Sequence, residues 1–253
     1  MNAPEHRGKL YLIPTTLGET SALEVIPLSV KRVIEQVDYY IVENEKSARR
    51  FIKKISPNKS QPKLEITLLN KYTDELELPS YLEPCFEGIS IGLLSEAGVP
   101  GIADPGADVV KIAHQKNIQV VPLVGPSSIL MAMMASGMNG QNFAFNGYLP
   151  IEQKQRKQEI KRLEKLSAEI GQTQVFIETP YRNNKMLLDM MNALHPDTRV
   201  CIACDITLST EFILTRPVSF WKNNLPDLNK RPCLLYTSPS PRDQRGSRMP
   251  SSA

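Results

Sequence analysis

The sequence predicts an α/β protein with two α/β domains. Short apolar runs alternate with segments of helical periodicity in the first half of the chain, which is typical of a mainly parallel sheet. One run, ISIGLLSE at 89–96, is apolar enough for a strand buried on both faces. Around 140–150 turn residues and then a strongly charged segment replace this alternation. We therefore expect one domain at 1–125 and a second at 126–232.

The first domain is predicted to alternate strands and helices. Strands are expected where short apolar runs end in Gly, Pro or polar residues, and helices where the apolar spacing is helical or a proline precedes the segment. The predicted strands are 10–14, 39–43, 89–96 and 118–125. The predicted helices are 28–36, 46–55 and 107–116.

The second domain is predicted to begin with the helix 126–136, because Pro126 is followed by two serines in the first turn. Further helices are expected at 152–166, where charge is dense, and at 183–194. A strand within 174–182 leads into a loop. Two adjacent strands joined by a short turn are expected within 200–216.

The segment 233–253 differs in composition from the rest. After Tyr236 it has no apolar periodicity, and Ser, Pro and Arg dominate. One interpretation is a disordered tail. We favour a non-native read-through tail, in which CLLY at 233–236 stands in for a final strand.

Composition excludes some classes of protein. The longest apolar helical run, at 129–138, is shorter than the ~20 residues of a membrane span, and the first residues lack an apolar centre. We expect a cytoplasmic protein without a membrane segment. The net charge of +3 does not by itself indicate nucleic acid, because two of these charges lie in 233–253.

The four cysteines do not predict a disulfide framework or a metal site. Cys201 and Cys204 form a CxxC, but they lie in a predicted strand, where residues three apart face opposite sides. The three histidines are scattered, without metal-ligand spacing. We therefore expect no bound metal.

Four predicted strand ends carry unusual numbers of Gly, Pro, Ser or Thr. Because ligands bind at the carboxyl ends of strands in α/β sheets, these loops predict a small-molecule site, although each taken alone is also consistent with an ordinary turn. No GxGxxG follows the first strand and no GxxxxGK[ST] is found, which disfavours nicotinamide dehydrogenases and P-loop NTPases. The four loops are PTTLGE (14–19), SEAGVPGIADPG (95–106), VGPSS (124–128) and ETPYR (178–182).

Four motifs carry a resemblance to a known family. LLSEAGVPGIADPG is similar to the pattern Ser-Asp-Ala-Gly-x-Pro followed by Asp-Pro-Gly, and LVGPSS to Val-Pro-Gly-Pro-Ser; FNGYLP and ETPYR are similar to two further signatures. Residues 9–232 thus resemble the tetrapyrrole methylase superfamily of S-adenosylmethionine (SAM)-dependent methyltransferases. Within it they look most like the group that methylates the 2′-hydroxyl of a cytidine ribose in small-subunit ribosomal RNA.

The resemblance implies a fold, a cofactor and partners. It implies two α/β domains of the tetrapyrrole methylase type with a SAM cleft between them. It also implies a homodimer that acts on ribosomal RNA or the small ribosomal subunit. The SAM-binding residues that it implies are Ser95, Glu96, Ala97, Gly98, Ile102, Ala103, Ser127, Ser128, Phe145, Gly147, Pro180 and Tyr181.

Two departures from that group's pattern bear on the substrate. Glu96 stands where the group usually has Asp, which keeps the acid but lengthens it by one methylene. In IVENEKSARR at 41–50 the group tends to have Glu-Asp-Thr-Arg, and only Glu43 matches. These differences indicate a divergent branch with a shifted cofactor pose or another substrate.

The candidates for a general base are Glu96, Glu43 and Glu178. Glu178 has the alternative of pairing with Arg182, and Asp104 is expected to fix its loop by accepting backbone N–H groups. No single base is singled out.

The charged helix supplies the candidate RNA-binding residues Lys154, Arg156, Lys157, Lys161 and Arg162. Interleaved glutamates leave open the alternative of a solvated helix of mixed charge. A second basic stretch lies at 46–54. The rival functions are a small-molecule, tetrapyrrole-like methyltransferase and a non-catalytic SAM-binding protein.

Overall fold

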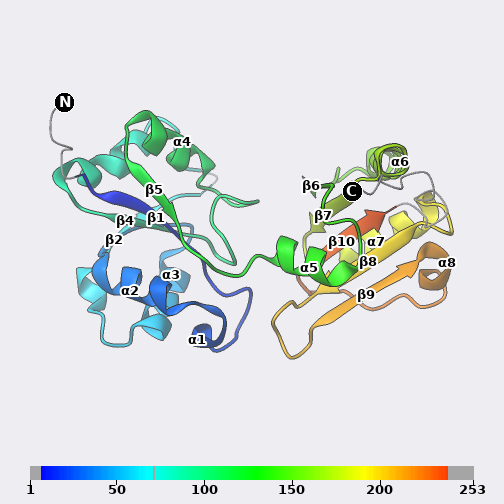
Figure 1. Cartoon of the computed structure of the whole chain (residues 1–253), viewed down its shortest axis with the longest axis horizontal. Coiled ribbons are helices and arrows are strands. Elements are labelled where there is room, and N and C mark those ends of the chain that lie inside the picture. Colours follow the sequence, from blue (N-terminus) through cyan, green and yellow to red (C-terminus); the bar gives the residue numbers. More distant parts are fainter. Residues whose placement is uncertain (1–6, 71, 239–253) are drawn as a thin grey trace, which may run out of the picture. The chain divides into compact units, whose positions relative to one another are not determined.

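The computed structural model describes residues 7–70 and 72–238. The chain divides into two compact units, one ending at Ser127 and one beginning at Ser128 (Figure 1). Within the described part of the chain, no helix combines the length and apolarity that a membrane crossing requires.

The first unit contains a five-stranded, fully parallel sheet in the order β3-β2-β4-β1-β5. All four residues of the central strand β4 are buried, as its apolar sequence predicts. Leu94 at its end pairs with Ile13 of β1 and Val42 of β2, so the chain leaves all three strands at one edge. The strands are β1 (Lys9–Ile13), β2 (Tyr39–Val42), β3 (Glu65–Leu68), β4 (Ile91–Leu94) and β5 (Gln119–Pro122).

Helices cover both faces of this sheet (Figure 1). α2 (Leu28–Gln36) and α3 (Glu45–Ile55) pack on one face, with the short α1 (Ala22–Val25) beside α3. α4 (Ala107–Gln115) and the 3₁₀ helix η2 (Leu78–Glu87) pack on the other. The described residues also include a 3₁₀ turn, η1 (Gln61–Lys63).

The sequence of α3 explains which of its sides faces solvent. Its buried residues are Ala48, Phe51, Ile52 and Ile55, which recur at the i, i+3, i+4, i+7 spacing of one helical face. The basic residues between them therefore point away from the core. Lys53 and Lys54 lie in the last turn, where cations interact favourably with the helix dipole.

The second unit contains a mixed sheet in the order β6-β7-β10-β8-β9. β10 is the last strand among the described residues, yet it lies in the middle of the sheet and pairs antiparallel with β7 and β8. β6 and β7 are parallel, and β8 and β9 are antiparallel. The strands are β6 (Phe143–Tyr148), β7 (Thr173–Glu178), β8 (Arg199–Cys204), β9 (Phe212–Pro217) and β10 (Cys233–Ser238).

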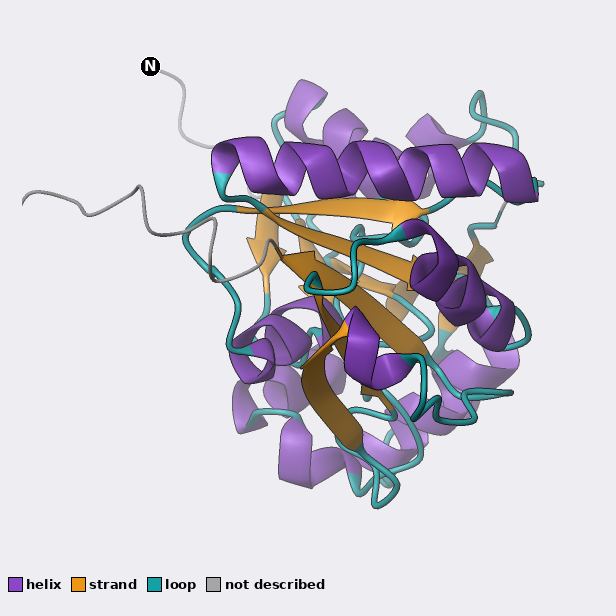
Figure 2. Cartoon of the chain, turned by 90° about the vertical axis from the view of Figure 1, so that its right-hand side faces the viewer, coloured by secondary structure: helices purple, strands orange, loops and turns teal. Residues whose placement is uncertain are grey.

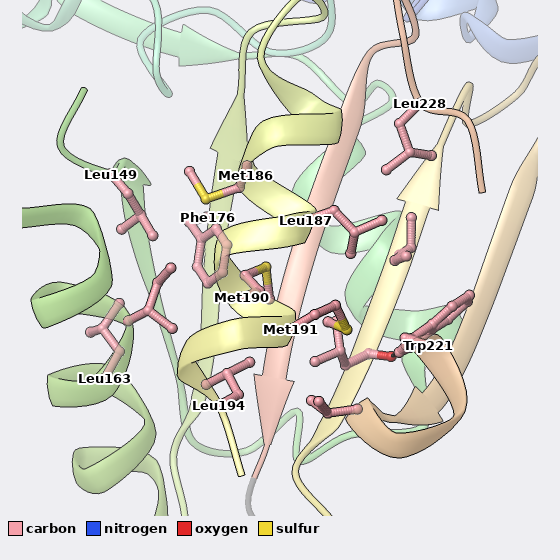
Figure 3. Packing of buried hydrophobic residues seen from close by; sticks show 14 of the residues in the cluster. Leu149, Leu163, Phe176, Met186, Leu187, Met190, Met191, Leu194, Trp221 and Leu228 are labelled. Carbon is pink, nitrogen blue, oxygen red and sulfur yellow. Dashed lines mark hydrogen bonds between the residues drawn. The ribbon is translucent and has the colours of Figure 1, made fainter. Parts of the chain in front are cut away.

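In the described part of this unit four helices accompany the sheet, and the longest of them, α6, lies alongside the strands in Figure 2. In Figure 3 the side chains of Met186 and Met190 on α7 lie near Phe176 of β7. Trp221 is buried, and its Nε1–H donates to the carbonyl oxygen of Val200 over 3.0 Å. The helices are α5 (Ser128–Ser136), α6 (Gln153–Ile170), α7 (Asn183–Ala193) and α8 (Val218–Trp221).

The predicted α/β class is confirmed, but some elements differ from prediction. The residues at 143–148 form a strand where the sequence indicated a turn, and Gly147, with φ of +61°, accommodates a register shift within it. The short strand β3 and helix η2 are not evident from the sequence pattern. The final strand expected at 233–236 is present as β10, and residues 239–253 of the predicted tail lie outside the described residues.

Candidate functional site

The loop after β4 is fastened to the end of β1. Ser95 is buried, and its Oγ donates to the carbonyl oxygen of Gly98 over 3.0 Å. The Thr15 backbone N–H donates to the same oxygen over 2.8 Å, and Thr15 Oγ1 donates to the Ser95 carbonyl oxygen over 3.3 Å. Because both strands leave the sheet at one edge, these bonds hold the first turn of the loop in a single conformation.

Gly98 cannot readily be replaced at this turn. Its φ of +76° lies in the left-handed region, which disfavours residues with a Cβ. A Cβ at this position would lie 3.1 Å from Leu17 Cδ2 and 3.3 Å from the Pro126 carbonyl oxygen. The glycine therefore allows three loops, those after β1, β4 and β5, to approach one another.

Three carboxylates gather at this edge of the sheet: Glu43 after β2, and Glu96 and Asp104 in the loop after β4. Burial and the charge of Glu96 raise the pKa of Asp104 to about 6. The pKa of Glu43 is raised by its burial and by the negative charges of Asp104 and Glu96. A hydrogen bond from the Glu96 backbone lowers this pKa but does not cancel the rise. Glu43 Oε1 is buried without a hydrogen-bond partner.

This group of carboxylates is not neutralised by the described part of the chain. Among the described residues, no ion pair involves Glu43, Glu96 or Asp104. The sequence predicted that the Asp104 carboxylate would accept hydrogen bonds from backbone N–H groups of its own loop. No such bond is found among the described residues. Clustered carboxylates without a cation suit a positively charged ligand. SAM carries a sulfonium and an ammonium group, so the residues present fit it.

A cavity of about 140 Å³ lies beside Glu96 in the first unit. Ser47 Oγ donates to Glu96 Oε1 within it, and Arg50 and Lys54 also line it. The sequence showed the basic stretch but not this contact, because pairing Ser47 with Glu96 requires α3 to face the loop after β4. The lining residues are Thr15, Thr16, Leu17, Gly18, Glu19, Ser47, Ala48, Arg50, Phe51, Lys54, Ser95, Glu96 and Ala97.

Asn44 is one of the residues within 41–50 that differ from the Glu-Asp-Thr-Arg pattern of the similar group. Its Oδ1 accepts from the backbone N–H groups of Lys46, over 2.9 Å, and Ser47, over 3.2 Å, and so caps the start of α3. Asn and Asp are comparably good caps. The change from Asp to Asn therefore preserves this local function while removing one negative charge.

The remaining predicted SAM contacts fall in different places. Ile102 is 51% exposed, and Ala103 has a φ of +62°, both in the loop after β4. Ser127 ends the first unit and Ser128 begins α5. In the second unit, Phe145 and Gly147 lie on β6. Pro180 and the exposed Tyr181 follow β7, so these four lie toward the edge at which the parallel strands β6 and β7 both end.

Glu178 is placed differently from the other candidate bases. It is the last residue of β7 and is buried. Its Oε1 accepts from Arg182 Nε over 2.9 Å, and its Oε2 from Arg182 Nη2 over 2.6 Å. Oε1 also accepts from the Thr179 backbone N–H over 2.6 Å. Both oxygens are thus engaged, which matches the ion-pair alternative for this residue.

Of the five predicted RNA-binding residues, Arg156 requires correction. Its side chain is 3% exposed, and Nε donates to Asp189 Oδ2 over 2.9 Å. Its Nη1 donates to the carbonyl oxygens of Pro150, over 3.1 Å, and Ile151, over 2.6 Å. A guanidinium so enclosed holds α6 against α7 and cannot contact RNA. The sequence placed it on a charged helix but did not show which side faces inward.

The other four are exposed or half-buried on α6. Arg162 forms an ion pair with Glu159 over 2.6 Å. Lys154, Lys157 and Lys161 line a groove of about 400 Å³ together with Asn192 of α7. Lys157 Nζ lies 3.6 Å from Asp189 Oδ1, whereas Lys154 and Lys161 have no ion-pair partner among the described residues.

Comparison with characterised proteins identifies related sequences. A protein named Ribosomal RNA small subunit methyltransferase I from Vibrio cholerae serotype O1 is 29% identical over 210 residues, covering 83% of this chain and 69% of that protein. The protein of the same name from Halalkalibacterium halodurans is 28% identical, and the match covers 83% of this chain and 68% of that protein. The one from Escherichia coli O157:H7 is 29% identical, and the match covers 86% of this chain and 72% of that protein.

Solved structures share the fold at lower sequence identity. The methyltransferase CobJ superposes with a TM-score of 0.62 at 12% identity, over 92% of this chain and 94% of that one. The cobalt precorrin-4 methyltransferase CbiF gives 0.59 at 15% identity, over 91% and 94%. The family model of the tetrapyrrole (corrin/porphyrin) methylases matches residues 9–219. This chain is therefore a methyltransferase that belongs to the tetrapyrrole methylase family.

Proposed function

We propose that this methyltransferase transfers a methyl group from SAM to a ribose 2′-hydroxyl in small-subunit ribosomal RNA. One observation carries the proposal. Relatives named for the ribosomal RNA of the small subunit match most of the chain at 28–29% identity, whereas CobJ and CbiF share the fold at only 12–15%. The homodimer and the cytoplasmic location expected from the sequence are part of this proposal, and light scattering of the purified protein would test the dimer.

The loop after β4 is the proposed binding element for SAM. When bound, SAM supplies a methyl carbon made electrophilic by its positively charged sulfur. Glu43, Glu96 and Asp104 offer negative charge to such a ligand, and Gly98 keeps the backbone of the loop close to the loops beside it. Alignment of two reactants by such fixed elements is worth roughly 7–11 kcal/mol of the barrier. The contacts implied for Ser127, Ser128, Phe145, Gly147, Pro180 and Tyr181 stay predictions.

Proton removal from the acceptor hydroxyl is assigned to the same carboxylates. A general base is most effective when its pKa lies near the working pH, and it contributes typically ~10²–10⁴-fold. The pKa values of Asp104 and Glu43 are both raised, which moves them in that direction. Glu96 lies in hydrogen-bond contact with Ser47 and lines the cavity. Glu178 is a weaker candidate because Arg182 engages both of its oxygens.

The lysine row, Lys154, Lys157 and Lys161, is the proposed phosphate-contacting surface. These residues lie at i, i+3 and i+7, which places them along one side of α6 at the groove. Lysines bind phosphates as point charges, and such contacts position a nucleic acid without reading its sequence. Asn192 adds an amide to the same groove. Arg162 stays a candidate, although its pairing with Glu159 competes with RNA.

The direct test is methyl transfer from labelled SAM. Small ribosomal subunits from cells that lack the corresponding methyltransferase should accept label, and the product should be a 2′-O-methylated nucleotide by mass spectrometry. A Gly98→Val variant should transfer none and is the negative control. Transfer to a tetrapyrrole ring, with none to ribosomal RNA, would instead establish the small-molecule alternative. SAM binding without transfer to either would establish a non-catalytic binding protein.

A further inference from the structure

We propose that Arg50 and Lys54 form a phosphate subsite for the RNA strand that carries the acceptor ribose, and that Glu19 occupies this subsite in the free protein. The proposal rests on the proposed function, because it takes the acceptor to be RNA. It assigns a substrate contact to the first unit, on α3 and the loop after β1, and is independent of the lysine row on α6.

The two cations converge on one carboxylate. Lys54 Nζ lies 2.6 Å from Glu19 Oε2, and Arg50 Nη2 lies 3.3 Å from Glu19 Oε1. Arg50 and Lys54 are exposed residues of α3, one helical turn apart. Hydrogen bonding and charge attraction from Lys54, followed by charge attraction from Arg50, lower the pKa of Glu19. Two cations therefore share a single carboxylate, so neither has an anion of its own among its ion-pair partners in the described residues.

The cations lie in the cavity of about 140 Å³ that also contains Ser47 and Glu96. A cavity of that size admits several water molecules, so it has room for a phosphate group. A phosphate held by Arg50 and Lys54 would thus bring the attached ribose toward Ser47 and Glu96. This neighbourhood distinguishes the cluster from an ordinary surface ion pair.

The contacts of Glu19 are of the kind that a phosphate can replace. Glu19 and Arg50 are largely exposed, with side chains 70% and 64% accessible, and exposed ion pairs are weak. Arg binds phosphate oxygens through a planar fork of donors, and Lys adds a second charge. Glu19 follows Gly18 in the loop after β1. Its carboxylate therefore acts as an internal substitute for the phosphate, which RNA must displace.

The test is binding of a fluorescein-labelled single-stranded RNA, measured by anisotropy at several KCl concentrations. Glu19→Gln should tighten binding by about two- to fivefold, because the cations lose their internal competitor. Arg50→Gln combined with Lys54→Gln should weaken binding and reduce the slope of log Kd against log salt by about 0.7 for a single phosphate contact. In that double-variant background, Glu19→Gln should have no further effect.

Matched variants separate the subsite from general charge effects. Glu24→Gln also removes one negative charge near the first loop, but Glu24 lies outside the cavity and should leave binding within twofold of wild type. Lys53→Gln is the control for Lys54, since Lys53 is exposed on α3 and does not line the cavity. A gain of affinity in Glu19→Gln cannot come from unfolding, so loss of stability cannot imitate the expected result.

The outcomes distinguish this proposal from the proposed function. Methyl transfer to ribosomal RNA by the wild type, with unchanged RNA binding in Glu19→Gln and in the double variant, would overturn the subsite and leave the function standing. If Glu19→Gln increased the affinity for RNA no more than Glu24→Gln does, the proposed subsite would also be overturned. If the wild type neither binds RNA nor transfers methyl to it, the function fails and the subsite fails with it.

Discussion

Arg156 on α6 and Asp189 on α7 form a buried ion pair in which two guanidinium nitrogens donate to the same carboxylate oxygen, Oδ2. Each side chain is 3% exposed. Burial alone would raise the pKa of Asp189, but hydrogen bonds from Gln153 and Arg156 outweigh it and hold this pKa below its ordinary value. The pair connects the two helices that pack most extensively in the second unit.

Removing one partner of this pair should destabilise the protein. Arg156→Gln leaves Asp189 buried without its main partner, which typically costs about 3–5 kcal/mol in the free energy of unfolding. Urea denaturation measures this loss. Arg156→Met combined with Asp189→Leu should recover much of it, because neither charge is then left buried alone. A stable Arg156→Gln variant with weakened RNA binding would instead restore Arg156 to the RNA interface.

Gly98→Val should abolish SAM binding, as measured by calorimetry. The left-handed φ of +76° costs a residue with a Cβ about 1–3 kcal/mol, and the added atoms would press on Leu17 and the Pro126 carbonyl. Gly101→Ala is the matched control, because Gly101 has a φ of +79° but no atom within 4 Å of its added Cβ. We expect that control to lose stability while keeping SAM binding. Normal SAM binding by Gly98→Val would refute the site assignment.

Asp104 should impose a pH dependence on stability. Its pKa is raised from 3.8 to about 6, so the folded state holds the proton more tightly than the unfolded state. The free energy of unfolding should therefore fall as pH rises through this interval and stay lower above it. Asp104→Asn should remove most of this pH dependence of the free energy of unfolding. It should also stabilise the protein at neutral pH by only on the order of 1 kcal/mol, because solvent screens the charge of a partly exposed group. Denaturation on either side of pH 6 would show this.

The same titration should act on SAM in the opposite direction. A cationic ligand binds better to ionised carboxylates, so SAM affinity should rise as pH increases through about 6 and Asp104 loses its proton. Calorimetry below and above that pH measures the change. Asp104→Asn should weaken the dependence. An affinity that is flat in the wild type would show that this carboxylate does not face the cofactor.

The lysine row should control the salt dependence of RNA binding. Replacing Lys154, Lys157 and Lys161 together by Gln should lower the slope of log Kd against log salt by about 2, since each phosphate contact contributes ~0.7–0.9. Lys165→Gln is the control on the same helix, because Lys165 pairs with Glu169 over 3.7 Å and does not line the groove. An unchanged slope in the triple variant would show that RNA binds elsewhere.

The order of elements could largely be predicted from the sequence, because apolar periodicity and strand-end glycines are local signals. β3 was missed because it is short. Its four residues, EITL, contain only two apolar residues, which is too few to establish a strand-like alternation. The strand at Phe143–Tyr148 was missed because Asn146 and Gly147 suggest a turn, whereas Gly147 takes its positive φ within a strand. Pairing with β7 outweighs that local preference.

The candidate site was only partly predictable. The motif SEAGVPGIADPG identified the loop, but its contact with Ser47 depends on how α3 packs against the sheet. The inward orientation of Arg156 likewise depends on Asp189, which is 33 residues away in sequence. Contacts between residues that are distant in sequence leave no recognisable spacing. The loop 14–19 and the basic stretch 46–54 were visible in the sequence, but the contacts of Glu19 with Arg50 and Lys54 depend on the fold.

Strand β10 should be essential for the second unit. A chain ending at residue 232 lacks the strand between β7 and β8, and both would then have an unpaired edge. Hydrogen exchange should show lost protection in β7 and β8, while β1 and β4, which pair within the other sheet, keep theirs. A chain ending at residue 238 should retain protection in all four. Equal protection in the two chains would contradict the pairing.

The central place of β10 also determines the order in which the chain can fold during synthesis. All five strands of the first sheet precede Ser128, so that sheet can be completed while translation continues. The second sheet cannot be completed until β10 (Cys233–Ser238) has been synthesised. β7 (Thr173–Glu178) begins about 60 residues before β10, and β8 (Arg199–Cys204) begins about 35 residues before it. Until then two strand edges face solvent, and the nascent second unit is exposed to aggregation and to chaperones.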